Sequence, residues 1–172
     1  MLDQKVGLGG VFTVECKDAD GNVKWVEEFH NLVVSTGLQY LNTQVFKGIT
    51  YTATWYMGLV TGPGAGNTYV AGDTMASHAG WTEAAGYAQA TRPVLSFGTA
   101  STATPSVIST STPAVYTVNA GATIGGAFIT TDNTKSGTAG TLFSVGNFTV
   151  GDRPVVSGDT INVTYTFSAN AA

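Results

Sequence analysis

The stretch that decides the fold is Thr54-Trp55-Tyr56-Met57-Gly58-Leu59-Val60. It is rich in aromatic, β-branched and aliphatic residues and contains no charged side chain. Strands that are buried on both faces have this composition, whereas a half-exposed strand alternates apolar and polar residues. We therefore predict that residues 54–60 form a central strand of the fold.

Two segments near the N-terminus predict a β-hairpin. In residues 7–15 and 23–29, apolar and polar residues roughly alternate, which is the pattern of a half-buried strand. Between them lies the turn-forming cluster Asp18-Ala19-Asp20-Gly21-Asn22. Short Asp, Asn and Gly clusters between two alternating segments are typical of hairpin turns.

Later segments predict further strands, separated by clusters of Gly, Asn, Asp, Ser or Pro. They cover residues 92–97, 114–118, 124–130, 141–144 and 160–167. Many short strands with turn signals at this spacing are typical of a sandwich of antiparallel sheets. The expected fold class is therefore all-β, a jelly roll or a related antiparallel β-sandwich.

One or two short helices are expected beside the strands. Ser35 is a candidate N-cap for the main helix. The apolar residues at helical spacing after it are Leu38, Leu41, Val45 and Phe46. Asp73 or Thr74 is a candidate cap for one helical turn that ends at Gly80.

The composition indicates one folded domain. Of the 172 residues, 43% are hydrophobic and only 10% are charged, so the chain has enough apolar surface to bury a core. We expect residues 1–172 to form a single β-sandwich domain with a flexible N-terminal segment. Residues 98–113 are almost entirely Ser, Thr, Ala and Pro, too little apolar area to offset the entropy of ordering. They are predicted to form a long loop or arm.

Charge and hydropathy argue against two classes of partner. A net charge of −4 leaves the chain without the basic surface that nucleic acids or anionic lipids require, so neither is expected to bind. No run of about eighteen apolar residues is present, so no membrane span is expected. Residues 1–5 begin no secretory signal pattern. We expect the protein to be made in the cytoplasm and to stay or assemble there.

No cofactor or metal site is predicted. Cys16 is the only cysteine, which excludes an intrachain disulfide and a metal site built on several thiolates. His30 and His78 are the only histidines, and their spacing does not place two imidazoles on one helical face. In residues 18–29 the glycine of a calcium loop comes at the fourth position instead of the sixth, so a hairpin turn is the preferred interpretation.

No catalytic residues are assigned. Asp73, Ser77 and His78 are the residue types of a nucleophile with its base, but close neighbours in a chain rarely point at one another, and no nucleophile elbow surrounds the serine. Asp73 and Glu83 are a candidate carboxylate pair whose separation the sequence does not fix. We expect the protein not to be an enzyme.

Three residues are candidates for an interface. Trp81 is a candidate exposed anchor, because tryptophan is frequent among the residues that dominate binding energy. Tyr87 is a second candidate. Arg92 either starts a strand or holds Asp73 or Glu83 with a fixed guanidinium, and the structural clamp is the preferred role.

Several segments together resemble structural proteins of tailed bacteriophages. These segments are Trp55-Tyr56-Met57-Gly58-Leu59-Val60, the run from Asp73 to Glu83, Tyr87 with Ala90-Thr91-Arg92-Pro93, and residues 124–129 and 158–166. The resemblance extends from about Asn31 to the end of the chain.

Among such proteins, the chain looks most like capsid decoration, or cement, proteins. This resemblance implies a β-sandwich on the capsid surface of the virion, which binds and stabilises the lattice of the major capsid protein. It also implies a homo-oligomer, with a trimer or a dimer suited to a lattice axis. It implies no catalytic residues.

Tail and fibre proteins also use β-sandwiches, so a second interpretation stays open. In it the chain is a tail or fibre component whose receptor- or glycan-binding site is formed by Trp81, Tyr87 and the loop of residues 62–72. The sequence alone does not distinguish a head location from a tail location.

Overall fold

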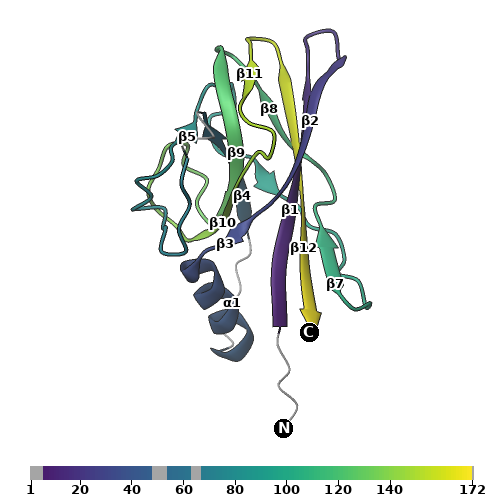
Figure 1. Ribbon diagram of the computed structural model, residues 1–172, viewed down its shortest axis with the longest axis vertical. Helices are drawn as coiled ribbons and strands as arrows, with labels where there is room; N and C mark the ends of the chain where they lie inside the picture. The colour runs from purple at the N-terminus through teal and green to yellow at the C-terminus, as the bar shows by residue number, and fades with distance from the viewer. Residues whose placement is uncertain (1–5, 48–53, 63–66, 172) are drawn as a thin grey trace.

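The computed structural model describes residues 6–47, 54–62 and 67–171. In that part of the chain two antiparallel sheets pack face to face, and one helix lies at one end of them (Figure 1). The predicted all-β fold, an antiparallel β-sandwich with a short helix, is confirmed. No helix of the described ranges is long and apolar enough to cross a bilayer.

The five-stranded sheet is built around the two longest strands. Its members are β1 (Val6–Lys17), β2 (Val23–His30), β7 (Ser106–Ser109), β8 (Ala114–Thr117) and β12 (Thr160–Ala171). Its order is β2-β1-β12-β7, and β8 also pairs with β12. β1 and β12 pair along their whole length, from Val6 opposite Ala171 to Lys17 opposite Thr160. The two ends of the described chain are therefore paired with each other.

The seven-stranded sheet contains the predicted central strand. Its members are β3 (Leu32–Val33), β4 (Trp55–Thr61), β5 (Glu83–Ala84), β6 (Val94–Leu95), β9 (Ala122–Thr130), β10 (Leu142–Asn147) and β11 (Arg153–Val155). Its order is β3-β10-β9-β4-β5, with β6 paired to β4 and β11 paired to β9. β4 has neighbours on both edges, which confirms that it is central.

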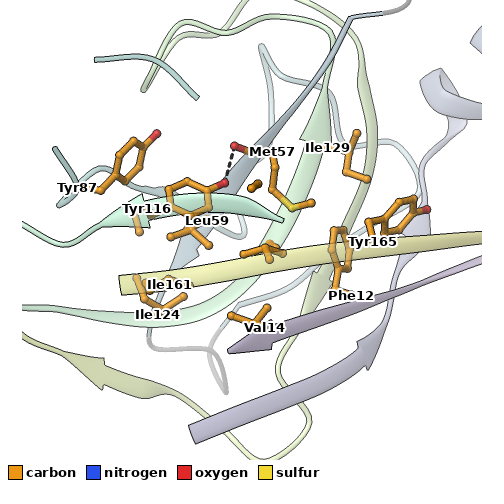
Figure 2. Close-up of a cluster of buried hydrophobic side chains, with 14 of the residues drawn as sticks. Phe12, Val14, Met57, Leu59, Tyr87, Tyr116, Ile124, Ile129, Ile161 and Tyr165 are labelled. Atoms are coloured by element: carbon orange, nitrogen blue, oxygen red, sulfur yellow. Dashed lines mark hydrogen bonds between the residues drawn. The ribbon is translucent and has the colours of Figure 1, made fainter. Parts of the chain in front are cut away.

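The main core lies between the two sheets (Figure 2). β1 contributes Phe12 and Val14, and β4 contributes Met57 and Leu59, all at most 1% exposed. Tyr116 of β8 lies fully inside this core, and its hydroxyl donates a 2.7 Å hydrogen bond to the Met57 carbonyl. Burial raises the pKa of this hydroxyl well above its ordinary value.

A second, smaller core covers the outer face of the seven-stranded sheet, the face turned away from the five-stranded sheet. Its buried members are Val34, Val60, Met75, Trp81, Phe128, Leu142 and Val145. Gly58 lies on this face, where the Phe128 ring packs directly on its backbone. β4 is thus buried on both faces, as predicted.

The predicted N-terminal hairpin is also confirmed. The Asp18 carboxylate accepts hydrogen bonds from the backbone N–H groups of Asp20 and Asn22, at 3.0 and 2.8 Å. Gly21 has a φ of 86°, a conformation that a residue with a side chain rarely adopts. At the other side of the turn, Cys16 is buried in the core, and burial raises the pKa of its thiol to about 11. The thiol is therefore protonated at neutral pH.

Helix α1 (Ser35–Lys47) is where it was expected, but the predicted cap is wrong, and of the predicted apolar face only Leu41 packs against the core. The Leu38 N–H donates to the Val34 carbonyl, which places Val34 at the N-cap position. Gly37 is the buried residue of the helix, because it packs against the carbonyl of Phe143 in β10. This close approach turns Leu38, Val45 and Phe46 toward solvent, with 41, 71 and 82% of their surface exposed.

Two other predictions are wrong. Asp73 to Gly80 contains no helical turn, because Thr74 and Ser77 exchange backbone hydrogen bonds in a tight turn. Residues 98–113 are not a free arm, because Ser106–Ser109 forms β7 and pairs with β12. The expected flexible segment of residues 1–5 and the middle of the 62–72 loop, residues 63–66, lie outside the described residues.

Gly58→Ala should destabilise the fold. A Cβ at this position would overlap the Phe128 ring, and overpacking of a core typically costs about 1–3 kcal/mol. Gly72→Ala is the control, because a Cβ there would meet no atom within 4 Å. Urea unfolding of both variants measures the difference. Equal unfolding midpoints for Gly58→Ala and the original protein would contradict the close packing.

Candidate functional site

Arg92 is the centre of a buried polar cluster on the outer face of the seven-stranded sheet. Its side chain is fully buried and makes a two-point ion pair with Glu83 of β5. Nε donates to Oε1 at 3.0 Å, and Nη2 donates to Oε2 at 2.7 Å. Of the two partners that the sequence left open for this guanidinium, the structure has Glu83, and the predicted structural clamp is confirmed.

The same guanidinium also binds the loop that follows β9. Nη1 donates to the Asp132 carbonyl and Nη2 to the Gly137 carbonyl, both at 2.9 Å. The guanidinium carbon lies 5.2 Å from the centre of the Phe128 ring. Arg92 therefore joins β5, the end of β9 and the residues before β6 in one hydrogen-bonded unit. Such a fully paired arrangement is the condition for burying a charge.

Residues 132–137 wrap around the Arg92–Glu83 pair. The Ser136 N–H donates to Glu83 Oε2 at 2.8 Å, and Ser136 has a φ of 58°, which is uncommon for a residue with a side chain. The Lys135 ammonium donates to the carbonyls of Tyr87 and Gln89, at 3.0 and 2.8 Å. Sequence reasoning missed these loop residues, because a polar turn gives no signal of which buried group it will bind.

Tyr87 lies inside the fold. It is 2% exposed, its ring packs edge to face on Tyr116 at 4.9 Å, and its hydroxyl lies 3.5 Å from Glu83 Oε1. Burial, followed by the nearby Glu83 charge, raises the pKa of this hydroxyl above its ordinary value. The Lys135 ammonium lies over the ring, 4.3 Å from its centre.

Trp81 is 3% exposed and belongs to the second core. Its indole N–H donates to Asp73 Oδ2 at 3.1 Å, and the His78 ring stacks on it at 3.9 Å. His78 Nδ1 lies 3.0 Å from the Trp81 carbonyl. The structure therefore brings Asp73 and His78 each onto Trp81, in contacts that stabilise the second core.

The exposed position expected for Trp81 is wrong, and the other two interface candidates, Tyr87 and Arg92, are also buried. Trp81, Tyr87 and Arg92 are 3, 2 and 1% exposed. Each polar group among them has a partner inside the fold, so burial leaves none of them unpaired. These three side chains lie beneath the surface residues and stabilise the fold from inside.

A cavity of about 270 Å³ lies next to the Arg92 cluster. Its polar lining consists of His78, Thr82, Glu83, Ser136 and Thr138. Glu83 is neutralised by Arg92, so the lining offers hydroxyl groups and one imidazole with little net charge. Chemically, this suits a neutral polar ligand. No group of three His, Cys, Asp or Glu side chains that could hold a metal ion occurs in the described ranges.

A second cavity, apolar and about 170 Å³ in volume, lies between α1 and the sandwich. Its walls include Tyr40 and Leu41 of α1, Ile108 of β7 and Phe167 of β12. Gln44 also lines it, and Gln44 Oε1 is buried without a hydrogen-bond partner in the described structure. Buried acceptors of this kind are rare in folded proteins.

Glu83→Gln should lower the free energy of unfolding by several kcal/mol. Removing one member of a buried ion pair leaves the other charge uncompensated, at a typical cost of about 3–5 kcal/mol. Adding Arg92→Met to this variant should restore part of the lost free energy of unfolding, because the guanidinium charge without a partner is then removed.

Glu15→Gln is the matched control, because Glu15 forms an ion pair with Lys17 in which both side chains are about a third exposed. Solvent screening makes that pair weak, so little change is expected. Denaturant unfolding of the four proteins measures these differences. Equal effects of Glu83→Gln and Glu15→Gln would show that the buried pair contributes no special stability.

Comparisons of the chain with protein families, with curated proteins and with solved structures found no match. The function must therefore be argued from the chain's own geometry and residues.

Proposed function

We propose that the chain is a structural protein of a tailed-phage virion, a capsid decoration protein that docks on the major capsid protein through the α1 end of the sandwich. The support has three parts: the resemblance of its segments to phage structural proteins, the β-sandwich fold, and an apolar surface on α1 that nothing in the described chain covers.

The observation that carries the proposal is this apolar surface, which we call the α1 stripe and define as Leu38, Val45 and Phe46. Phe46 is 82% exposed and Val45 is 71% exposed. A surface helix normally turns its apolar residues inward, whereas α1 places Gly37 against β10 and leaves these three residues exposed. Apolar residues gathered on an exposed helix mark interaction sites.

The position of the α1 stripe suits docking by one end of the molecule. Figure 1 shows α1 at the same end as the start of β1 and the end of β12. Val6 of β1, which is 69% exposed, adds an apolar residue at that end. A rigid sandwich that presents one end to a lattice leaves its other end free for solvent.

The scarcity of charge supports contact with many subunits. Only 10% of the residues are charged, so a docked copy desolvates few ions. A trimer or dimer at a lattice axis binds more tightly than one copy. Once the first copy has bound, the contacts of the other copies form within the same complex, which raises the overall affinity. The polar clusters described above serve the interior of the fold, which agrees with a structural role.

A second candidate function is a receptor- or glycan-binding site on a tail or fibre. The cavity of about 270 Å³ beside His78 favours it, because hydroxyl-bearing side chains line it together with aromatic ones. Neutral sugars offer matching hydroxyl groups and apolar faces. The two candidates predict different numbers of copies per particle.

The copy number of the chain in purified virions tests the proposal. A decoration protein should reach a ratio to the major capsid protein near one, or a simple fraction such as about one third, as lattice symmetry requires. Quantitative mass spectrometry measures this ratio. A ratio of a few per cent would favour the tail candidate, and absence from the particle would refute both.

The double variant Val45→Ser/Phe46→Ser should weaken binding to capsids that lack the protein, roughly tenfold or more, because two apolar side chains lose their burial. The control is Val150→Ser/Val156→Ser, whose residues are similarly exposed but flank β11, at the opposite end from α1 in Figure 1. Co-sedimentation with capsids gives the affinities. Equal binding by both variants would rule out docking through the α1 stripe.

A further inference from the structure

The apolar cavity between α1 and the sandwich has an internal wall and a helical wall. The internal wall includes Ile129 and Tyr165, which Figure 2 shows in the same part of the core. The helical wall is formed by Tyr40, Leu41 and Gln44 of α1. The cavity thus lies on the side of α1 that faces the sheets and next to the α1 stripe.

Two polar groups of the residues that line this cavity differ in whether they have a hydrogen-bond partner. The Tyr165 hydroxyl accepts a hydrogen bond from Asn31 Nδ2 at 2.9 Å. Gln44 Oε1 is buried and has no partner in the described structure. An acceptor that stays buried and unpaired is destabilising. A ligand that brings a hydrogen-bond donor into the cavity would remove this penalty.

The size and lining of the cavity limit what can enter. A cavity of about 150 Å³ lined by aliphatic and aromatic residues binds one benzene ring, and this cavity measures about 170 Å³. The lining is mainly apolar and carries no charged side chain, so a charged ligand would lose its hydration without compensation. A small aromatic group, of one ring or two fused rings, with a single donor group fits both limits.

Two side chains in proteins have this chemistry, the indole of tryptophan and the phenol of tyrosine. Both are enriched at the centres of interfaces, where they act as anchors in pockets. In the described part of the chain no tryptophan or tyrosine is exposed. The described residues of a second copy therefore offer no such anchor, which favours a different protein as its source.

We propose that the cavity is a socket for one tryptophan or tyrosine side chain of the partner protein, and that Gln44 Oε1 accepts the hydrogen bond of its N–H or O–H group. The inference deepens the proposed function, since it names the anchor that the partner inserts beside the α1 stripe. Only the identity of the partner rests on that function. The chemistry of the socket rests on the cavity itself.

Small-molecule probes test the socket without any knowledge of the partner. Indole and p-cresol reproduce the two side chains, and indene and toluene are close analogues without the donor. Indole should bind roughly three- to tenfold more tightly than indene, the contribution expected of one hydrogen bond. Titrations followed by NMR should shift the signals of Leu41, Ile108 and Phe167, which line the cavity.

Gln44→Met keeps the length of the side chain and removes the amide oxygen. In this variant indole and indene should bind equally, with indene unchanged. Gln39→Met is the matched control, because Gln39 is an exposed residue of the same helix, and it should preserve the preference for indole. Equal binding of indole and indene to the unmodified protein, or shifts that map outside the cavity, would overturn the proposal.

The same probes separate this proposal from the proposed function. Saturating indole should compete with binding to capsids that lack the protein. If indole binds as expected and the chain is absent from virions, the socket stands and the phage assignment fails. If the chain coats virions and saturating indole leaves its binding unchanged, the socket is not the docking anchor.

Discussion

The ion pair between Arg92 and Glu83 joins the edge strand β5 to the loop that follows β9. The outer face of the seven-stranded sheet is covered by irregular chain, whose backbone groups need partners as soon as they are buried. Arg92 supplies them, since it binds two carbonyls of residues 132–137 besides the carboxylate of Glu83. Trp81 and Phe128 can then stay dry beneath this cover. The ion pair thus helps to hold the cover over the outer face of β4, whose composition is that of a strand buried on both faces.

Two regions of the molecule differ in how their surfaces are completed. Around Arg92, hydrogen bonds inside the fold satisfy the buried polar groups that the sequence placed there. Around α1, the opposite holds: a glycine takes the buried position, apolar side chains face solvent, and Gln44 Oε1 is buried without a partner. This contrast agrees with the proposal that a partner binds at α1.

Long strands were predictable from the sequence because an alternating pattern extends along β1 and β12 and a continuous apolar run marks β4. The helix was predictable from apolar residues at helical spacing. Strands of two or three residues, such as β3 and β5, are too short to carry a pattern and exist only because a neighbour pairs with them. The face of α1 was mispredicted because a close approach of Gly37 to Phe143 sets it, and hydropathy does not report such a contact. Arg92 was assigned correctly as a clamp, since so few charges are present that a nearby carboxylate was its natural partner. The carbonyls of Asp132 and Gly137, which also bind Arg92, could not be predicted, because backbone groups of a polar loop carry no sequence signal.

The brevity of the outer strands has a consequence for crowding. In the described chain, β3, β5, β6 and β11 have two or three residues each, and β7 and β8 have four. The longer edge strand, β2, is distorted by a register shift opposite Cys16 and Lys17 and carries the exposed charges of Lys24 and Glu28. Short, bulged or charged edges do not template the addition of a further strand. Many copies can therefore be held side by side at high local concentration without growing into amyloid-like fibrils, a hazard that any densely arrayed β protein must avoid.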